Sequence, residues 1–295
     1  MNSSGHRAFS PGRIAAITAN TLTELTRLKV FYVLLFFALL LIGSSIFMAR
    51  LTFQQEFQVL KDIALGAMSI FTSLLAVLAT ARLIPQDRED RTIYTILAKP
   101  VPRSEYLLGK LLGVILLLAL SVTIMGAVFL VVLNLREHAV LNETASQMSG
   151  APPAQIAEAL AAIRASAFNV NLLSGIAIIF VKACLLASLT LFVSTFATTT
   201  IFTTIVMVCV YFIGHLQGIA REYWLQNNSA GWLTKTFLGL VTLLFPDLQL
   251  FNLTDDIVVG TAIPSALFAK TVTLGFFYSG FYLLLSWAVF YRKEL

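Results

Sequence analysis

The stretch LLGVILLLALSVTIMGAVFLVVL, residues 111–133, contains no charged side chain. A helix of about 20 such residues is long enough to cross the hydrocarbon core of a bilayer, which is roughly 30 Å thick. Strands of a membrane barrel would show short segments of alternating polarity instead of one unbroken apolar run. This stretch therefore predicts a transmembrane helix.

Five further apolar runs in the chain meet the same test. They cover residues 30–49, 63–84, 170–196, 199–220 and 271–291. Only 12% of the 295 residues are charged and 58% are hydrophobic, whereas a water-soluble domain is usually about 25% charged. We therefore expect an all-α polytopic membrane protein that has six transmembrane helices in a single domain over residues 1–295.

The distribution of cations sets the expected topology. Six spans put both termini on one side of the membrane, and cytoplasmic segments carry an excess of Lys and Arg. Most of the 20 Lys and Arg residues fall on the side of the termini and of the loop at about 85–105. Both termini are therefore expected in the cytoplasm, with segments 134–169 and 221–264 outside. The net charge of +5 follows from this topology and does not indicate nucleic-acid binding.

Three segments outside the spans have helical signals of their own. Ser10-Pro11 is typical of a helix start, and residues 13–28 predict an interfacial helix with an apolar stripe of Ile14, Ile17, Leu22, Leu25 and Leu28; a disordered tail is the alternative. Residues 154–167, after two prolines, predict a short external helix. Residues 232–245 are apolar but too short to span, which favours a re-entrant or interfacial helix between spans five and six.

The loop between spans two and three concentrates charge in the stretch REDRTIYTILAKPVPRSEYLLGK, residues 88–110. One interpretation is a solvated loop that only satisfies the positive-inside rule. The other starts from Ile93, Ile96 and Leu97, whose spacing places them on one face of a short helix that Pro100 ends. Such a helix at a membrane exit would be a docking element for a cytoplasmic partner.

This loop resembles that of the ABC-2 type transporter permease family, in which an acidic start and a Pro-x-x-Arg precede Gly-Lys at the opening of a span. The matching residues are Asp87, Glu89, Thr92, Pro100, Arg103, Glu105, Gly109 and Lys110. The stretch FPDLQLFN, residues 245–252, resembles the branch that contains the membrane subunit of the nitrous-oxide-reductase maturation transporter.

The resemblance implies the permease subunit of an ATP-binding cassette exporter in a bacterial inner membrane. It implies a separate ATP-binding subunit that carries ATP and magnesium, and no cofactor on this chain. It also implies that the chain pairs in the lipid membrane with a second copy of itself or with a different permease. The residues it assigns to ATPase coupling are Asp87, Arg88, Glu89, Arg91, Thr92, Ile93, Ile96, Leu97, Pro100 and Arg103.

The chain itself lacks the pattern of an ATPase. A phosphate-binding loop needs G-x-x-x-x-G-K-[ST], but Ser104 stands where the first glycine belongs and Leu111 follows Lys110. The three histidines are scattered and form no H-E-x-x-H motif, so we expect no enzyme. An ion-driven secondary transporter and a structural subunit of a larger membrane complex remain the alternatives.

Lys182 lies deep inside the fourth predicted span. A lysine at such a depth costs about 2.5–3.5 kcal/mol on insertion scales. Three interpretations are open: its stem extends to the headgroups, its amine bonds inside the bundle, or it lines the substrate pathway and attracts an anion. The apolar spans with scattered Thr and Ser fit a hydrophobic or amphiphilic cargo.

Overall fold

The computed structural model describes residues 10–50, 55–90, 102–169, 171–226, 236, 246–252, 257–258 and 264–292. Within these residues every regular element is a helix. The elements are α1 (Pro11–Thr26), α2 (Lys29–Arg50), α3 (Glu56–Ala81), α4 (Leu83–Glu89), α6 (Arg103–Gln147), α7 (Pro153–Ala167), α8 (Asn171–Phe196), α9 (Thr200–Gln226), the 3-10 helix η1 (Leu248–Phe251) and α12 (Ser265–Arg292). Six helical stretches are long and apolar enough to cross a membrane, which confirms the predicted fold class.

Prolines mark the starts of three helices. Pro11 is the first residue of α1, a position that its fixed φ angle suits and where no amide donor is needed. Pro102 has an extended backbone, with φ −60° and ψ 140°, and α6 begins directly after it with Glu105 in its first turn. A negative charge there interacts favourably with the helix dipole. Pro152 and Pro153 open α7 in the same way.

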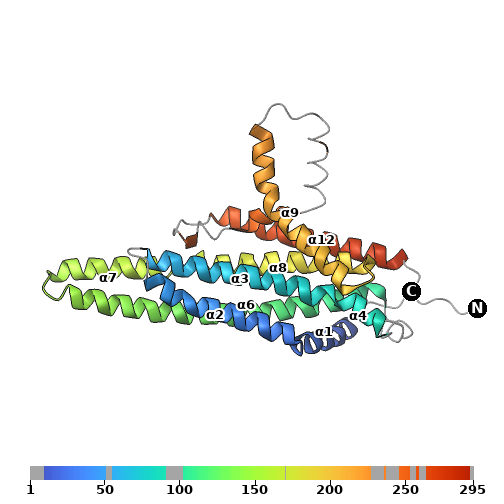
Figure 1. The fold of residues 1–295 in the computed structure, drawn as a ribbon, viewed down its shortest axis with the longest axis horizontal. Coiled ribbons are helices and arrows are strands. Elements are labelled where there is room, and N and C mark those ends of the chain that lie inside the picture. Colours follow the sequence, from blue (N-terminus) through green and yellow to red (C-terminus); the bar gives the residue numbers. More distant parts are fainter. Residues whose placement is uncertain are drawn as a thin grey trace, which may run out of the picture.

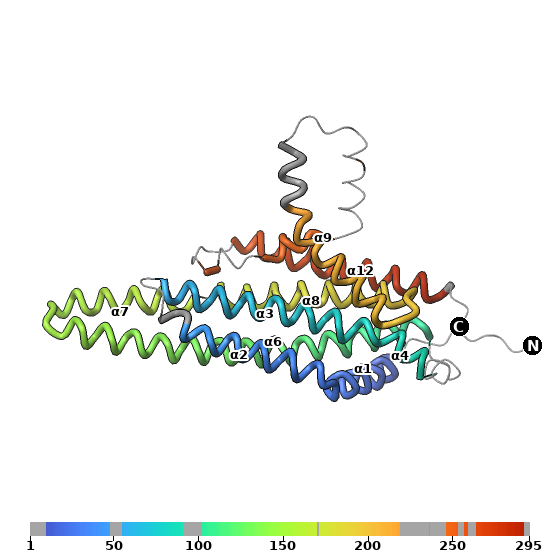
Figure 2. Tube along the Cα trace, in the orientation of Figure 1, coloured from blue at the N-terminus to red at the C-terminus, as the bar shows by residue number. Residues whose placement is uncertain are grey.

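The long helices lie side by side and form one bundle (Figure 1). Helix α8 is the inner helix and contacts α3, α6, α9 and α12, and nearly all its side chains from Ile178 to Thr195 are buried. The tube in Figure 2 shows α1 and α4 at one end of the bundle and α7 at the opposite end. We call the end with α1 and α4 the loop-base end, because α4 and α6, which border the charged loop, meet there. The end with α7 is called the hairpin end.

The outer surface of the bundle is apolar where a lipid-facing surface must be. Phe36 and Phe37 of α2, Ile205 of α9, and Phe276 and Phe277 of α12 are all exposed. A soluble protein rarely exposes such a large contiguous apolar surface. In a membrane the same side chains face lipid, and the helices satisfy their own backbone hydrogen bonds.

Helix α6 is much longer than the predicted span 111–133. It runs over 45 residues from Arg103 to Gln147, which corresponds to about 68 Å. Neither Gly nor Pro occurs between Gly126 and Gly150, so nothing in the sequence stops the helix where hydrophobicity falls. Segment 134–169, expected as a loop with one short helix, is therefore a hairpin of the end of α6 and α7, and α7 matches the expected helix.

Two buried cations fasten this hairpin to α3. The Arg136 Nε atom donates to Glu56 Oε2 at 3.1 Å, and the Lys61 ammonium donates to the Ser166 carbonyl at 2.7 Å. Both cationic side chains are buried. Each therefore needs its partner, because an unpaired charge in the interior is costly.

Helix α1 packs along the first half of α6 through two glycines. A Cβ on Gly113 would lie 2.7 Å from Thr21 Cβ, and one on Gly109 would lie 2.8 Å from Ile17 Cβ. The Thr18 hydroxyl donates to the Gly109 carbonyl at 3.2 Å. Small residues four apart allow helices to approach closely in a membrane.

The buried face of α1 differs from the predicted stripe. Its buried side chains are Ile14, Thr18, Thr21 and Leu25, whereas Ile17, Leu22 and Leu28 of the predicted stripe are half-buried. Thr18 and Thr21 lie beside Ile17 on the face that contacts α6, where the two glycines allow the close approach.

Two predicted features fall outside the described residues. One is the apolar helix at 232–245, of which the structure describes only Thr236. The other is the central part of the charged loop, which holds Arg91, Thr92, Ile93, Ile96, Leu97 and Pro100.

We predict that Gly113→Ala destabilises the protein by about 1–3 kcal/mol, the usual cost of overpacking a well-packed contact. Gly66→Ala is the matched control, because a Cβ there meets nothing within 4 Å. The control should be neutral or slightly stabilising, since Ala favours helix more than Gly does. Unfolding of both variants in mixed micelles measures the difference, and equal stabilities would contradict the close α1–α6 contact.

Candidate functional site

The residues that border the charged loop meet at the loop-base end of the bundle. The last turn of α4 carries Asp87, Arg88 and Glu89, and α6 begins with Arg103. We use the term loop base for Asp87, Arg88, Arg103, Glu105 and Lys110. These residues hold the end of α4 and the start of α6, which flank segment 91–101 in sequence, against the bundle.

Two arginines of the loop base bind the carboxyl ends of distant helices. The Arg88 guanidinium donates to the carbonyls of Thr195 at 2.8 Å and Ala197 at 3.1 Å, at the end of α8. Arg103 donates to the carbonyls of Phe290 at 2.8 Å and Tyr291 at 2.9 Å, at the end of α12. The last carbonyls of a helix have no partner within it and carry partial negative charge, so both contacts are favourable.

Asp87 points into the protein and is only 7% exposed. Its carboxylate pairs with the Lys110 ammonium at 2.8 Å and accepts a hydrogen bond from the Tyr106 hydroxyl. Lys110 also lies 3.6 Å from Glu24 of α1. The Tyr106 ring in turn stacks on Phe290 of α12, with centroids 6.0 Å apart. The structure therefore gives Asp87 an internal ion pair, while Glu89, two residues further on, is exposed.

A second ion pair joins α1 to the start of α6. The Arg13 Nε atom donates to Glu105 Oε2 at 2.7 Å, and Glu105 also accepts from the Ser10 backbone amide at 3.0 Å. Glu105 is only 1% exposed. Its hydrogen bond to Arg13 raises the pKa of that guanidinium above its ordinary value. Arg13 therefore stays charged throughout the accessible pH range.

The loop base thus ties together α1, α4, α6, α8 and α12. Of the predicted coupling residues, the structure brings Asp87, Arg88 and Arg103 into it and leaves Glu89 on the surface; the remaining six lie in the undescribed segment. Sequence reasoning gave no role to Tyr106, although Tyr106 and Lys110 are four residues apart and therefore share one face of a helix. From this spacing, the sequence could have predicted that Tyr106 lies beside Lys110 at the loop base.

Lys182 lies inside the bundle with 2% of its surface exposed. Its ammonium is 3.4 Å from Ser69 Oγ of α3 and 3.0 Å from His215 Nε2 of α9. It also lies 5.6 Å from the centroid of the Tyr211 ring, within the range of a cation–π interaction. Among the described residues no Asp or Glu pairs with Lys182.

The described part of the stretch FPDLQLFN, residues 246–252, fills a space between α8, α9 and α12. Leu248 of η1 lies against Gly214, and Phe251 lies against Gly275, where an added Cβ would be 2.8 Å and 3.1 Å from their side chains. Both side chains are buried. Asp247 accepts a hydrogen bond from the Gln249 amide at 3.0 Å, which starts the short helix.

The arrangement is that of a multi-pass membrane subunit whose polar chemistry is concentrated at one end of its bundle. A family model described as ABC-2 family transporter protein matches residues 24–292. The chain therefore belongs to the ABC-2 transporter family, whose members are the membrane permease subunits of transporters that pair with an ATP-binding subunit. No curated protein matches the chain.

We predict that Lys110→Met costs about 3–5 kcal/mol of stability, because it leaves the Asp87 carboxylate buried without its cation. The double variant Asp87→Asn with Lys110→Met should recover much of this loss, since no uncompensated charge remains. Lys270→Met, at an exposed position of α12, serves as the control and should change little. A double variant as unstable as Lys110→Met alone would show that the ion pair is not the cause.

Proposed function

We propose that this permease is the exporter subunit of its transporter and that segment 91–101 docks into the ATP-binding subunit. The observation that carries the proposal is the set of contacts from Arg88 and Arg103 to the ends of α8 and α12. A segment that was only a connection would not need its two ends fastened to two separate helices.

In this proposal the docking face and the transmitting residues are distinct. Glu89, together with Arg91, Thr92, Ile93, Ile96, Leu97 and Pro100, contacts the ATP-binding subunit. The buried Asp87 and the two arginines hold the segment to the bundle. When the ATPases close on nucleotide, the displacement of the segment moves α4 and the start of α6, and the arginines pass it to α8 and α12.

ATP and magnesium belong to the partner in this mechanism. The residues around Gly109 and Lys110 support this, because they form a helix that packs against α1 and ion-pairs with Asp87. A nucleotide would need the backbone amides of an open glycine loop there. The chain binds no cofactor of its own in the proposed scheme.

We further propose that two permease copies, or this chain and a second permease, form the transport path in a bacterial inner membrane. The exposed apolar faces of α2, α9 and α12 leave room for both a second permease and lipid. From the sequence likeness of residues 245–252, we also propose that the chain lies near the branch that contains the membrane subunit of the nitrous-oxide-reductase maturation transporter.

We predict that Glu89→Arg combined with Ile96→Asp weakens binding of the ATP-binding subunit at least about tenfold, because it reverses an exposed charge and puts an unpaired charge on the docking face. Co-purification in mild detergent and ATPase activity measure the effect. Glu158→Arg, an equivalent reversal on an exposed part of α7, is the control. Unchanged complex yield and ATPase activity would make the segment a solvated connection.

The cytoplasmic placement of both termini has its own test. Cysteines introduced at Ser3 and Glu294 should be protected from an impermeant thiol reagent in intact cells, whereas one at Asn142, near the end of α6, should be labelled. Cys184 is buried and Cys209 is exposed, so the experiment uses a Cys209→Ser background. Labelling at either terminus would overturn the proposed topology.

A further inference from the structure

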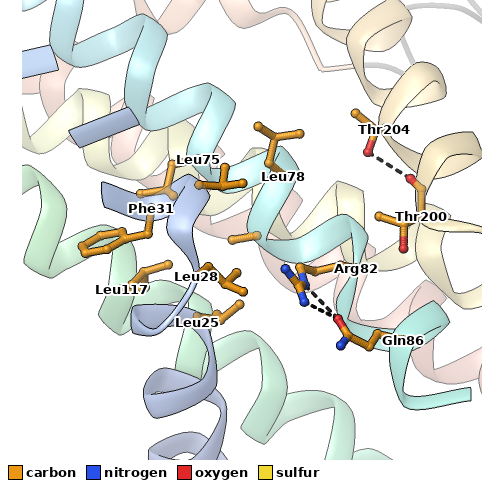
Figure 3. Close-up of a pocket in the computed structure, with 12 residues that line it drawn as sticks. Leu25, Leu28, Phe31, Leu75, Leu78, Arg82, Gln86, Leu117, Thr200 and Thr204 are labelled. Atoms are coloured by element: carbon orange, nitrogen blue, oxygen red, sulfur yellow. Dashed lines mark hydrogen bonds between the residues drawn. The ribbon is translucent and has the colours of Figure 1, made fainter. Parts of the chain in front are cut away.

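A cavity of about 250 Å³ lies at the corner where α1 turns into α2 (Figure 3). Leu25 and Phe31 line it from the two sides of this corner, and Leu75 of α3 and Leu117 of α6 also belong to its apolar wall. Ligand sites are concave and mostly apolar, with a few polar groups that fix the orientation of the ligand. The corner cavity has the apolar part of such a site.

The polar groups of the corner cavity lie at its edge toward the loop base. Figure 3 shows Arg82 and Gln86 at one side, with Thr200 and Thr204 of α9 across from them. The Arg82 Nε atom donates to Gln86 Oε1 at 2.9 Å, and the Nη2 atom donates to the same oxygen. An amide oxygen has no formal charge, and among the described residues no Asp or Glu ion-pairs with Arg82. Within that part of the chain, the cavity therefore holds a half-buried cation without a counter-charge.

The order of these groups along the bundle is that of a phospholipid. Arg82 directly follows the last residue of α3 at the loop-base end, and Leu75 lies about 10 Å deeper along the same helix. Arg27 and Lys29, at the turn between α1 and α2, add two exposed cations to this corner. Basic pockets between membrane helices on the cytoplasmic side bind the heads of anionic phospholipids. The cavity thus has cations at the level of the headgroups and an apolar wall at the level of the acyl chains.

We propose that the corner cavity binds one anionic phospholipid as a resident lipid, which is not cargo. Its phosphate accepts hydrogen bonds from Arg82, and the Gln86 amide nitrogen donates to the glycerol part of the head. One acyl chain lies against the apolar wall between the corner and α3. Because Arg82 also precedes α4, which carries Asp87, the bound lipid stabilises the loop base. Membranes rich in anionic lipid therefore favour the assembled loop-base end.

Lipid binding to the permease alone tests the proposal. The delipidated protein in detergent is titrated with dilauroyl phosphatidylglycerol, and native mass spectrometry counts the bound lipids. Dilauroyl phosphatidylcholine is the first comparison, because it has the same chains and a choline that cancels the phosphate charge. Glycerol 3-phosphate is the second, because it is a head without chains. We expect one phosphatidylglycerol to bind at least about tenfold more tightly than phosphatidylcholine, with no competition from glycerol 3-phosphate.

Two variants separate the head contact from the acyl-chain contact. Arg82→Met should lower the affinity for phosphatidylglycerol to that for phosphatidylcholine, because it removes the cation and keeps an apolar stem. Arg164→Met, at an exposed position of α7 at the hairpin end, is the matched control and should leave the affinity unchanged. Leu28→Trp puts a larger side chain at the cavity wall and should weaken binding of both lipids.

Three results would overturn the proposal: equal affinity for the two lipids, wild-type affinity in Arg82→Met, or competition by glycerol 3-phosphate, which would make the cavity a site for a free head. If Arg82→Met does not fold, the selectivity of the unmodified protein and the Leu28→Trp variant decide the outcome. Because no ATP-binding subunit is present, a negative result leaves the docking of segment 91–101 untouched. Failure of the docking variants, in turn, does not alter this binding measurement.

Discussion

The pairing of Asp87 with Lys110 holds together α4 and α6, the two helices that border the charged segment 91–101 in sequence. Both side chains are buried, so each depends on the other, and breaking such a pair leaves an uncompensated charge in a medium that solvates it poorly. The pair joins α4 to α6 directly, across a segment that links them in sequence. The contacts of Arg88, Arg103 and Tyr106 with α8 and α12 are built around that junction. The residues on both sides of the segment are therefore joined to α8 and α12.

The six spans could be predicted from sequence because their length and hydrophobicity are set by the bilayer itself. The extent of α6 could not be predicted in the same way. Hydropathy reports where a side chain leaves lipid, whereas a helix ends where its backbone is interrupted, and residues 134–147 contain no such interruption. In this chain the residue at which the membrane span ends is therefore different from the residue at which the helix ends.

The loop base shows a similar division. The family resemblance assigned Asp87, Arg88 and Arg103 to one coupling loop, but it could not tell that Asp87 is buried while Glu89 is exposed. That difference depends on where α6 places Lys110. The partners of Lys182 were equally hidden, since Ser69 is 113 residues away and His215 is 33 residues away. Contacts between helices that are distant in sequence are settled by packing, which local patterns do not record.

The unbroken course of α6 has a mechanical consequence. One continuous helix of 45 residues has the loop base at one end and the hairpin with α7 at the other, about 68 Å away. A rod pivoting within the bundle converts a small tilt at its base into a larger sweep of its far tip. Because Arg136 and Lys61 fasten the hairpin to α3, that displacement of the tip is shared with α3 at the far end of the bundle.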